Sequence, residues 1–469
     1  MLSQPAFSLS AYLHARLNGR INRLLPRHLF ERRRLRRFRR FAAFARARSP
    51  FYRDIMAERG IDPRRCRPED FPVLSKQEVM QNFDRIVTAP NVRRADIEEF
   101  LHRNRDVKTL FRDRYMVAHT SGTSGVLGIF VFDAKAWSRG FGQVPNTREH
   151  MRRRGGRRRV AFVGCTGGHY AGPGFFATLA RPPLDRLFDL RLIEINAPLA
   201  AIVAQLNEFA PDQLGSYGSM LRLLAERKLA GELTIAPSIL TVGAEPLLPG
   251  DREVAERAFG VGVKIYYAAS EHMMMGFKAP GSETMRLFED ELIFEIQPDH
   301  ICVTNLFNRT LPLIRYRMED VLVPGDDDEH RPYRGVAELV GRSENAPIFR
   351  NRHGEPDWIS PHTINQILLP RVRRFQLRVH GAESFTFAMV LEPGTDAAAE
   401  RYTLSAAEAC WSDLLAAKEM ENVTCRIILV DDLPLDPQTG KFRLILQDAA
   451  AAAGVGSEAA AATGPAEVP

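Results

Sequence analysis

Residues 120–128 read Thr-Ser-Gly-Thr-Ser-Gly-Val-Leu-Gly, so nine positions hold three glycines and four hydroxyl side chains. Glycines let a loop turn sharply, and its backbone N–H and side-chain O–H groups can then point at one anion. An apolar, β-prone segment follows directly at 129–132. We therefore expect a phosphate-binding loop. Ser/Thr/Gly clusters are also ordinary turns between apolar segments, so the loop is informative only together with other motifs.

The loop differs from that of the P-loop NTPases. No lysine or arginine lies between Thr120 and Lys135, and the pattern GxxxxGK[ST] is therefore absent. If the loop binds phosphates, a cation from elsewhere in the chain must balance their charge.

Four further groups of chemically capable residues follow in chain order. Residues 267–271 include an aromatic ring, a hydroxyl and a carboxylate behind an expected strand, and residues 312–320 combine two arginines with an aspartate. Residues 341–344 read Gly-Arg-Ser-Glu, and the turn-rich loop 434–443 presents one lysine. A turn or a charged surface could explain each group alone. Neither explains why all four groups follow the phosphate loop in this order.

In this order the motifs resemble those of the adenylate-forming superfamily of acyl- and aryl-CoA synthetases, nonribosomal adenylation domains and luciferases. Within it, the chain is most similar to the phenylacetate-CoA ligase and coenzyme F390 synthetase-like subgroup. The opening pattern of that subgroup, SPFYR followed by LPVxxK, resembles residues 49–53 and 71–76. The resemblance extends from about residue 35 to residue 446.

The resemblance implies an ATP site with Mg²⁺. Glu271 would bind the metal and Lys441 would be the mobile lysine of adenylation, so these two are the candidate catalytic residues. The other nucleotide contacts are implied for the phosphate loop (Thr120, Ser121, Gly122, Thr123, Ser124, Gly125), the adenine side (Gly243, Ala244, Glu245, Tyr267), the α-phosphate (Ser270) and the ribose side (Asp320, Arg342).

Three motifs depart from the family pattern. Leu127-Gly128 replaces Pro-Lys at the end of the phosphate loop, Ala268 replaces the glycine of YGxTE, and Met318-Glu319 replaces the first two residues of TGD. The loss of the loop lysine weakens the expected hold on the γ-phosphate. It leaves Glu271 and Lys441 in place.

The implied reaction joins a carboxylic acid to AMP and then transfers the acyl group to a thiol of CoA or an acyl carrier protein. Attack of a carboxylate on the α-phosphate brings two anions together, so Mg²⁺ and the Lys441 ammonium would stabilise the transition state. Because water would destroy the acyl-adenylate, a small C-terminal domain would close during adenylation and then swing about the hinge residue Glu344.

An aromatic acid is the expected substrate, and a short acyl or amino acid is the second choice. Glycines beside aromatic residues leave a flat slot, and a histidine could meet a polar group on the ring. The pocket residues implied by the resemblance are Gly168, His169, Tyr170, Tyr217 and His272. Either histidine could equally be a hydrogen-bonded structural residue.

The alternation of helical patterns with short apolar runs predicts an α/β fold for the first part of the chain. We expect a large layered N-terminal adenylation domain (1–341), a small mobile α+β C-terminal domain (342–447) and a disordered tail (448–469). Strands are expected at 160–164, 239–243, 263–267, 300–305, 375–379, 385–391 and 424–430, and helices at 221–230, 251–259 and 397–418.

Composition is typical of a large enzyme: 469 residues, 45% hydrophobic, with a net charge of +7. No apolar run approaches the ~18 residues of a transmembrane helix, and no signal peptide is recognisable, so we expect a cytoplasmic protein. The five cysteines are scattered, which indicates neither a disulfide framework nor a zinc site.

The densest positive charge lies at 31–40, where apolar residues recur at helical spacing. This pattern predicts an amphipathic helix with a solvated arginine face, and no nucleic-acid motif accompanies it. Two alternatives to a ligase stay open: a degenerate homologue that binds nucleotide without ligating, and a protein that binds polyanions or membranes through this helix. The oligomeric state is not predicted.

Overall fold

The computed structural model describes residues 7–120, 127–144, 156–245, 247, 249–298, 300–325, 333–340, 347–359, 363–364, 367, 369–434 and 444–447. It forms two compact units. The first contains the described residues of Met1–Thr120, Gly128–Glu194 and Ala204–Gly341, and the second contains those of Ser121–Leu127, Ile195–Val203 and Arg342–Pro469. The boundary expected at 341 and the tail expected from 448 lie outside the described residues and stay predictions.

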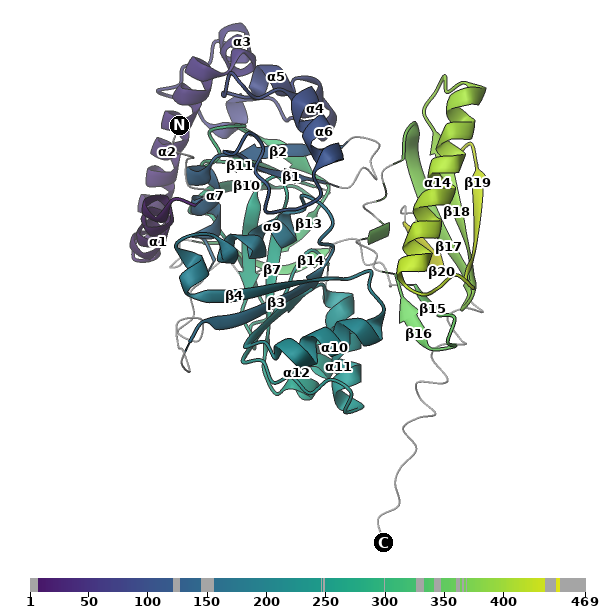
Figure 1. Ribbon diagram of the computed structural model, residues 1–469. Helices are drawn as coiled ribbons and strands as arrows, with labels where there is room; N and C mark the ends of the chain where they lie inside the picture. Colours follow the sequence, from purple (N-terminus) through teal and green to yellow (C-terminus); the bar gives the residue numbers. More distant parts are fainter. Residues whose placement is uncertain are drawn as a thin grey trace. The chain divides into compact units, whose positions relative to one another are not determined.

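A twisted sheet is the centre of the first unit (Figure 1). Its described strands, in spatial order, are β13 (Val321–Pro324), β14 (Gly335–Val340), β9 (Met285–Leu287), β8 (Met273–Lys278), β7 (Val263–Ala269), β6 (Ile239–Val242), β5 (Gln213–Ser216), β3 (Arg158–Gly164) and β4 (Phe188–Glu194). From β4 to β7 the strands are parallel, and β8, β9, β14 and β13 extend the sheet antiparallel. Parallel strands end at one edge, so the loops after β3, β5, β6 and β7 lie near one another.

Helices and two smaller sheets complete the first unit. Helices α11 and α12 pack against each other beside the sheet (Figure 1). The helices are α1 (Leu9–Arg23), α2 (Arg27–Arg48), α3 (Pro50–Glu58), α4 (Lys76–Gln81), α5 (Phe83–Ile86), α6 (Arg94–Arg103), α7 (Ala134–Phe141), α9 (Ala171–Ala177), α11 (Gly218–Leu229) and α12 (Pro249–Phe259), with short 3₁₀ turns at Pro68–Asp70, Thr178–Ala180 and Leu184–Arg186. Helix α10 (Leu199–Phe209) is divided between the units, and its residues from Ala204 onward belong to the first. The smaller sheets pair β1 (Met116–His119) with β2 (Ile129–Phe132), and β11 (Ile301–Asn305) with β10 (Leu292–Ile296) and β12 (Tyr316–Met318).

Helix α2 confirms the amphipathic helix expected around residues 31–40. Phe30, Phe38 and Phe41 are buried on its inner side. Two of its arginines are used inside the protein: Arg34 pairs with Glu289 at 2.7 Å and Arg37 pairs with Glu291 at 2.5 Å. Part of the arginine density therefore serves to attach α2 to the body of the first unit, and the rest includes the exposed Arg32, Arg36 and Arg40.

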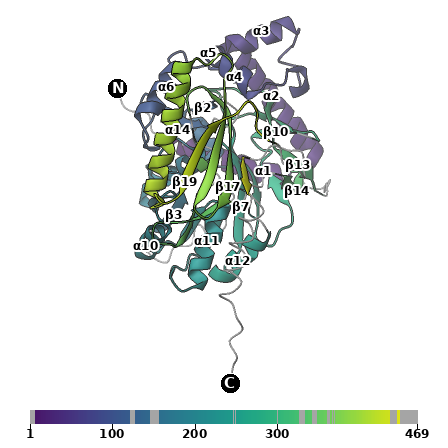
Figure 2. The same cartoon turned by 90° about the vertical axis from the view of Figure 1, so that its right-hand side faces the viewer.

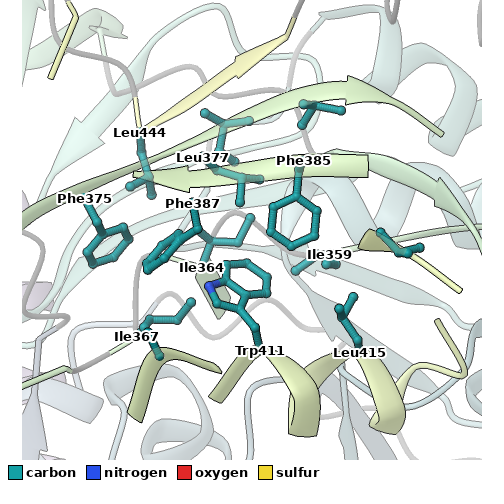
Figure 3. Close-up of a cluster of buried hydrophobic side chains, with 14 of the residues drawn as sticks. Ile359, Ile364, Ile367, Phe375, Leu377, Phe385, Phe387, Trp411, Leu415 and Leu444 are labelled. Atoms are coloured by element: carbon teal, nitrogen blue, oxygen red, sulfur yellow. The ribbon is translucent and has the colours of Figure 1, made fainter. Parts of the chain in front are cut away.

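The second unit has its own hydrophobic core. Helix α14 (Ala397–Ala417) covers a sheet of β19 (Thr424–Leu429), β18 (Ser384–Leu391), β17 (Val372–Gly381) and β20 (Ile445–Gln447) (Figure 2). Trp411 from the helix packs against Phe385 and Phe387 of β18, with ring centroids 4.7 and 5.2 Å apart (Figure 3). A two-stranded ribbon of β15 (Ile348–Arg350) and β16 (Pro356–Trp358) also belongs to this unit.

The strands and helices expected from the sequence are all confirmed, with ends that shift by at most a few residues. Within the described residues, no helix is long and apolar enough to cross a membrane.

Candidate functional site

The predicted site residues gather at the carboxyl edge of the parallel strands. Gly168 follows β3, Tyr217 follows β5, Gly243 follows β6, and Ser270 follows β7. Their register is fixed by the ladder, in which Val163 pairs with Ser216, and Ser216 pairs with Val242. This edge is where ligands bind in open α/β sheets.

Glu271 is the centre of a charged cluster at the end of β7. Its side chain is only 6% exposed, and its Oε1 accepts a hydrogen bond of 3.2 Å from Tyr316 Oη. Burial raises the pKa of Glu271 above its ordinary value, the ammonium of Lys76 offsets part of that shift, and the charge of Asp320 adds to it. The structure therefore brings a lysine, a tyrosine and two carboxylates together around the expected metal ligand.

The sequence pattern includes Lys76 only as the end of the opening motif and gives it no role. It is the first residue of α4, whose N-terminus is capped by reciprocal bonds between Ser75 and Glu78. The preceding Leu74 bridges to the strand that contains Tyr316: its N–H donates to Arg315 O at 3.0 Å, and its carbonyl accepts from Arg317 N at 2.9 Å. This bridge attaches the start of α4 to the strand of Tyr316, and the charge of Lys76 lowers the pKa of Glu271 from there. The phosphate loop contains no lysine or arginine, and this absence was the sequence signal that a cation from elsewhere must complete the site.

The base of the phosphate loop is tightly closed. Thr120 N donates to Gly128 O at 2.8 Å, and Gly128 N donates to Thr120 Oγ1 at 3.1 Å. A Cβ at position 128 would lie 2.6 Å from Thr120 Oγ1. Gly128 thus closes the loop where the family pattern has a lysine. Ser121, Gly122, Thr123, Ser124 and Gly125 lie outside the described residues.

The loop base also contacts the end of β7. Ser270 Oγ donates to His119 O at 3.0 Å, and His119 directly precedes Thr120. Ser270, the expected α-phosphate contact, is therefore bonded to the residue from which the phosphate loop starts. Tyr267 is buried, and its pKa is raised well above the ordinary value by burial and by the nearby charge of Asp320. Tyr267, the expected adenine contact, is therefore close to Asp320, the expected ribose contact.

On the adenine side, Glu245 is held by the start of α11. Its Oε2 accepts hydrogen bonds from Ser219 N at 3.2 Å and from Ser219 Oγ. Ala244 adopts a left-handed backbone with φ of +67°. Such a backbone is uncommon for alanine and is a feature of tightly specified turns.

Two histidines of the expected acyl pocket are buried and neutral. Burial lowers the pKa of His169 to about 4 and that of His272 to about 3. Within the described residues, neither ring nitrogen of His272 has a hydrogen-bond partner, and its ring packs edge-on to Tyr316 at 5.6 Å. Buried polar groups normally have partners, so this ring is a candidate contact for a ligand.

The other pocket candidates lie in the loop after β3 and at the end of β5. His169 O accepts from His119 N at 3.0 Å, the Tyr170 ring lies 4.5 Å from the His119 ring, and a Cβ at Gly168 would lie 2.9 Å from that tyrosine ring. Tyr217, at the end of β5, is 1% exposed, and its hydroxyl accepts a hydrogen bond of 3.2 Å from Cys165 N. Tyr217 thus supports the loop after β3.

Mg²⁺ fits Glu271 on the chemistry of its donor. Within the described residues, no group of three or more acidic, histidine or cysteine side chains could hold a metal by itself. Mg²⁺ is typically bound by one or two carboxylates together with substrate phosphates, which a single glutamate beside a phosphate loop would satisfy. Arg342, Glu344 and Lys441 lie outside the described residues, and their roles stay predictions.

Comparisons with known proteins agree on the fold. No known family profile matches the chain. The protein CapK of Staphylococcus aureus is 24% identical over 299 residues, which are 61% of this chain and 61% of CapK. The chain thus matches less than two thirds of the length of this curated relative.

Two solved structures of 2-hydroxyisobutyryl-CoA ligase align with nearly the whole chain. The complex with 2-HIB-AMP and CoA in the thioesterification state has a TM-score of 0.55 at 19% identity, with 94% of each chain covered. The postadenylation complex with R3-HIB-AMP has a TM-score of 0.53 at 18% identity, again with 94% of each chain covered. The chain has the fold of the adenylate-forming enzymes, with a large α/β unit and a smaller C-terminal unit, as expected. Its narrower resemblance to phenylacetate-CoA ligases stays a prediction.

Proposed function

We propose that this chain, on its adenylate-forming fold, activates a carboxylic acid with ATP and transfers the acyl group to a thiol. The main support is the cluster of Glu271, Lys76 and Tyr316 beside the base of the hydroxyl-rich loop. A buried carboxylate with a raised pKa next to an ammonium is costly to stability and is typical of a site that binds a charged ligand.

In the first half-reaction, a carboxylate oxygen of the acid attacks the α-phosphorus of ATP, and pyrophosphate leaves. Mg²⁺, when bound, neutralises charge on the phosphates. Glu271 would hold the metal, with Tyr316 fixing the carboxylate by a hydrogen bond. Lys76 would supply the positive charge that the phosphate loop lacks. Tyr267 and Asp320 would bind adenine and ribose.

In the second half-reaction, a thiol attacks the carbonyl carbon of the acyl-adenylate, and AMP leaves. The acceptor is CoA or an acyl carrier protein. We assign Lys441 to the first half-reaction, where phosphate charge develops, and Glu344 to the hinge between the two. Both roles rest on the sequence resemblance.

For the acid, we propose an aromatic ring, with a short acyl or amino acid as the second candidate. His169 and His272 are neutral at physiological pH, so each can offer one N–H donor and one acceptor nitrogen to a substituent. Gly168 lets the Tyr170 ring pack directly against the backbone, since a Cβ there would lie 2.9 Å from that ring.

A pyrophosphate-exchange screen over aryl, short acyl and amino acids tests the proposal, with the positive acids repeated with CoA and with a carrier protein. We expect exchange with at least one acid, dependence on Mg²⁺, and loss in Glu271→Gln. Nucleotide binding without exchange for every acid would favour the degenerate homologue. A cytoplasmic location stays a prediction.

A further inference from the structure

Helix α1 buries small and polar side chains and exposes large apolar ones. Its buried residues are Ala15, Asn18, Gly19 and Asn22, which recur at the spacing that normally places apolar residues in the core. Its large apolar residues face outward instead. We call these the leucine stripe, and their exposed fractions are 47% for Leu9, 54% for Leu13, 58% for Leu17, 39% for Ile21 and 85% for Leu24.

The inward face of α1 is fixed by polar and close contacts. Asn22 Nδ2 donates to Asp290 Oδ1 at 2.5 Å, and Asn18 Oδ1 accepts from Arg33 Nη2 at 2.6 Å. A Cβ at Gly19 would lie 3.1 Å from Asp290 Oδ2. These contacts hold the helix in one rotation about its axis. The contacts of Asn18, Gly19 and Asn22 therefore determine that the leucine stripe faces outward.

The N-terminal end of α1 is held in the same way. Phe7 packs edge-on against Phe141 of α7 with ring centroids 6.0 Å apart, and Ser8 N donates to Ser138 Oγ at 2.8 Å. Single exposed leucines are common on protein surfaces, but five at steps of three or four residues make a continuous apolar strip. Such a strip indicates a docking surface.

The charge around the leucine stripe is strongly positive. Between Leu9 and Arg40 the sequence has eleven arginines and one acidic residue, Glu31. Arg20 is exposed and lies one turn from both Leu17 and Leu24 on the same helix. On α2, the next helix in the chain, Arg32, Arg36 and Arg40 are also exposed. An apolar strip with basic neighbours is complementary to anionic lipid.

We propose that the leucine stripe of α1 docks this protein on an anionic membrane surface. The leucines enter the boundary between headgroups and acyl chains, and Arg20 pairs with lipid phosphates. A second copy of the chain is a poorer occupant, because a symmetric interface would bring two arginine-rich segments together. The inference is independent of the proposed ligase activity.

Flotation of the full chain with vesicles tests the proposal. We expect binding to phosphatidylcholine vesicles that contain phosphatidylglycerol and little binding to pure phosphatidylcholine. Leu13→Gln/Leu17→Gln should weaken partitioning at least about tenfold, because two apolar side chains no longer enter the bilayer. Arg20→Gln should weaken it about fivefold. The matched control is Leu187→Gln/Leu229→Gln, which alters leucines of similar exposure, 41% and 51%, outside α1 and should bind as the wild type does.

A fluorescence measurement gives a second readout that does not depend on loss of binding. Leu17→Trp should show a blue shift with phosphatidylglycerol vesicles, and Leu229→Trp should not. Equal flotation of the wild type and Leu13→Gln/Leu17→Gln would overturn the proposal. A second result would also overturn it: the wild type does not bind vesicles, but it self-associates in their absence, and Leu13→Gln/Leu17→Gln abolishes that self-association. A second copy of the chain would then cover the stripe.

Discussion

At the residue scale, burial of the Glu271 carboxylate lowers the stability of the fold, and the same carboxylate is the proposed Mg²⁺ ligand. Because burial raises its pKa, the folded protein binds the proton more tightly than the unfolded chain, whose glutamate has the ordinary value of 4.5. Stability is therefore lost as pH rises through 4.5 toward the folded pKa, and the loss persists at pH 7. We predict that Glu271→Gln unfolds at higher denaturant than the wild type at pH 7 and that the difference disappears below pH 4.5.

The same Glu271→Gln variant should lose activity, because an amide is a poor ligand for Mg²⁺. We expect turnover to fall about a hundredfold and the Mg²⁺ requirement to rise, by analogy with the loss of one electrostatic group in a site. The amide oxygen can still accept the hydrogen bond from Tyr316. An unchanged Mg²⁺ titration would remove Glu271 from the metal site.

Lys76 provides the second prediction at this scale. Lys76→Met should lower the rate of pyrophosphate exchange about 10²- to 10³-fold, because its ammonium acts beside Glu271 and the phosphate loop has no lysine or arginine of its own. Removal of the ammonium also raises the pKa of Glu271 further, so the acid limb of the pH–rate profile should move to higher pH. Lys76→Arg should retain part of the activity. The control is Lys135→Met, an exposed lysine on α7, and equal losses in both variants would contradict the assignment.

At the scale of elements, buried ion pairs attach α2 to the turn between β9 and β10. Glu291 is 1% exposed and accepts from Arg37 and Arg139. Burial alone would raise its pKa, but these two guanidinium groups hold it below the ordinary value of 4.5. Its contribution to stability is therefore present above pH 4.5 and is lost as pH falls through the folded pKa.

We predict that Glu291→Gln lowers the free energy of unfolding by about 3–5 kcal/mol at pH 7, because two arginines are left without a buried counter-ion. Denaturant titration measures this loss. Glu31→Gln is the control, since Glu31 is half exposed and pairs with Arg27 on the surface of α2, where such pairs contribute about 0–1 kcal/mol. Similar small effects in both variants would mean that water reaches Glu291.

Most elements could be predicted from the sequence because their signals are local. The apolar runs of β3, β6 and β7 and the periodicity of α14 depend only on neighbouring residues. The helix at 27–48 was also predictable, but its partners Glu289 and Glu291 were not, since a pair separated by more than two hundred positions leaves no local pattern.

The site was predictable only as far as its motifs reach. Tyr267, Ser270, Glu271 and Asp320 were named from the family pattern. The roles of Lys76 and Tyr316 required the bridge of Leu74 to the strand with Tyr316, which no sequence pattern records. The outward leucines of α1 were missed for a related reason, because helical periodicity identifies an apolar face without saying whether that face is covered.

At the scale of the whole molecule, each unit has a hydrophobic core of its own, which in the second unit surrounds Trp411 (Figure 3). Units with separate cores can fold and move as separate bodies. If the second unit delivers Lys441 for adenylation only, the two half-reactions should respond differently to its loss.

We predict that Lys441→Ala lowers adenylate formation by about 10²- to 10³-fold, equivalent to about 3–4 kcal/mol of transition-state stabilisation, because the ammonium acts where phosphate charge develops. Thioester formation from a preformed acyl-adenylate should stay near the wild-type rate, since no new phosphate charge arises in that step. Pyrophosphate exchange measures the first rate and thiol consumption the second. Intrinsic tryptophan fluorescence, to which the buried Trp411 contributes, provides the folding control, because the variant should leave the core of the second unit intact. Equal losses in both half-reactions, with that core unchanged, would contradict a lysine that serves one step only.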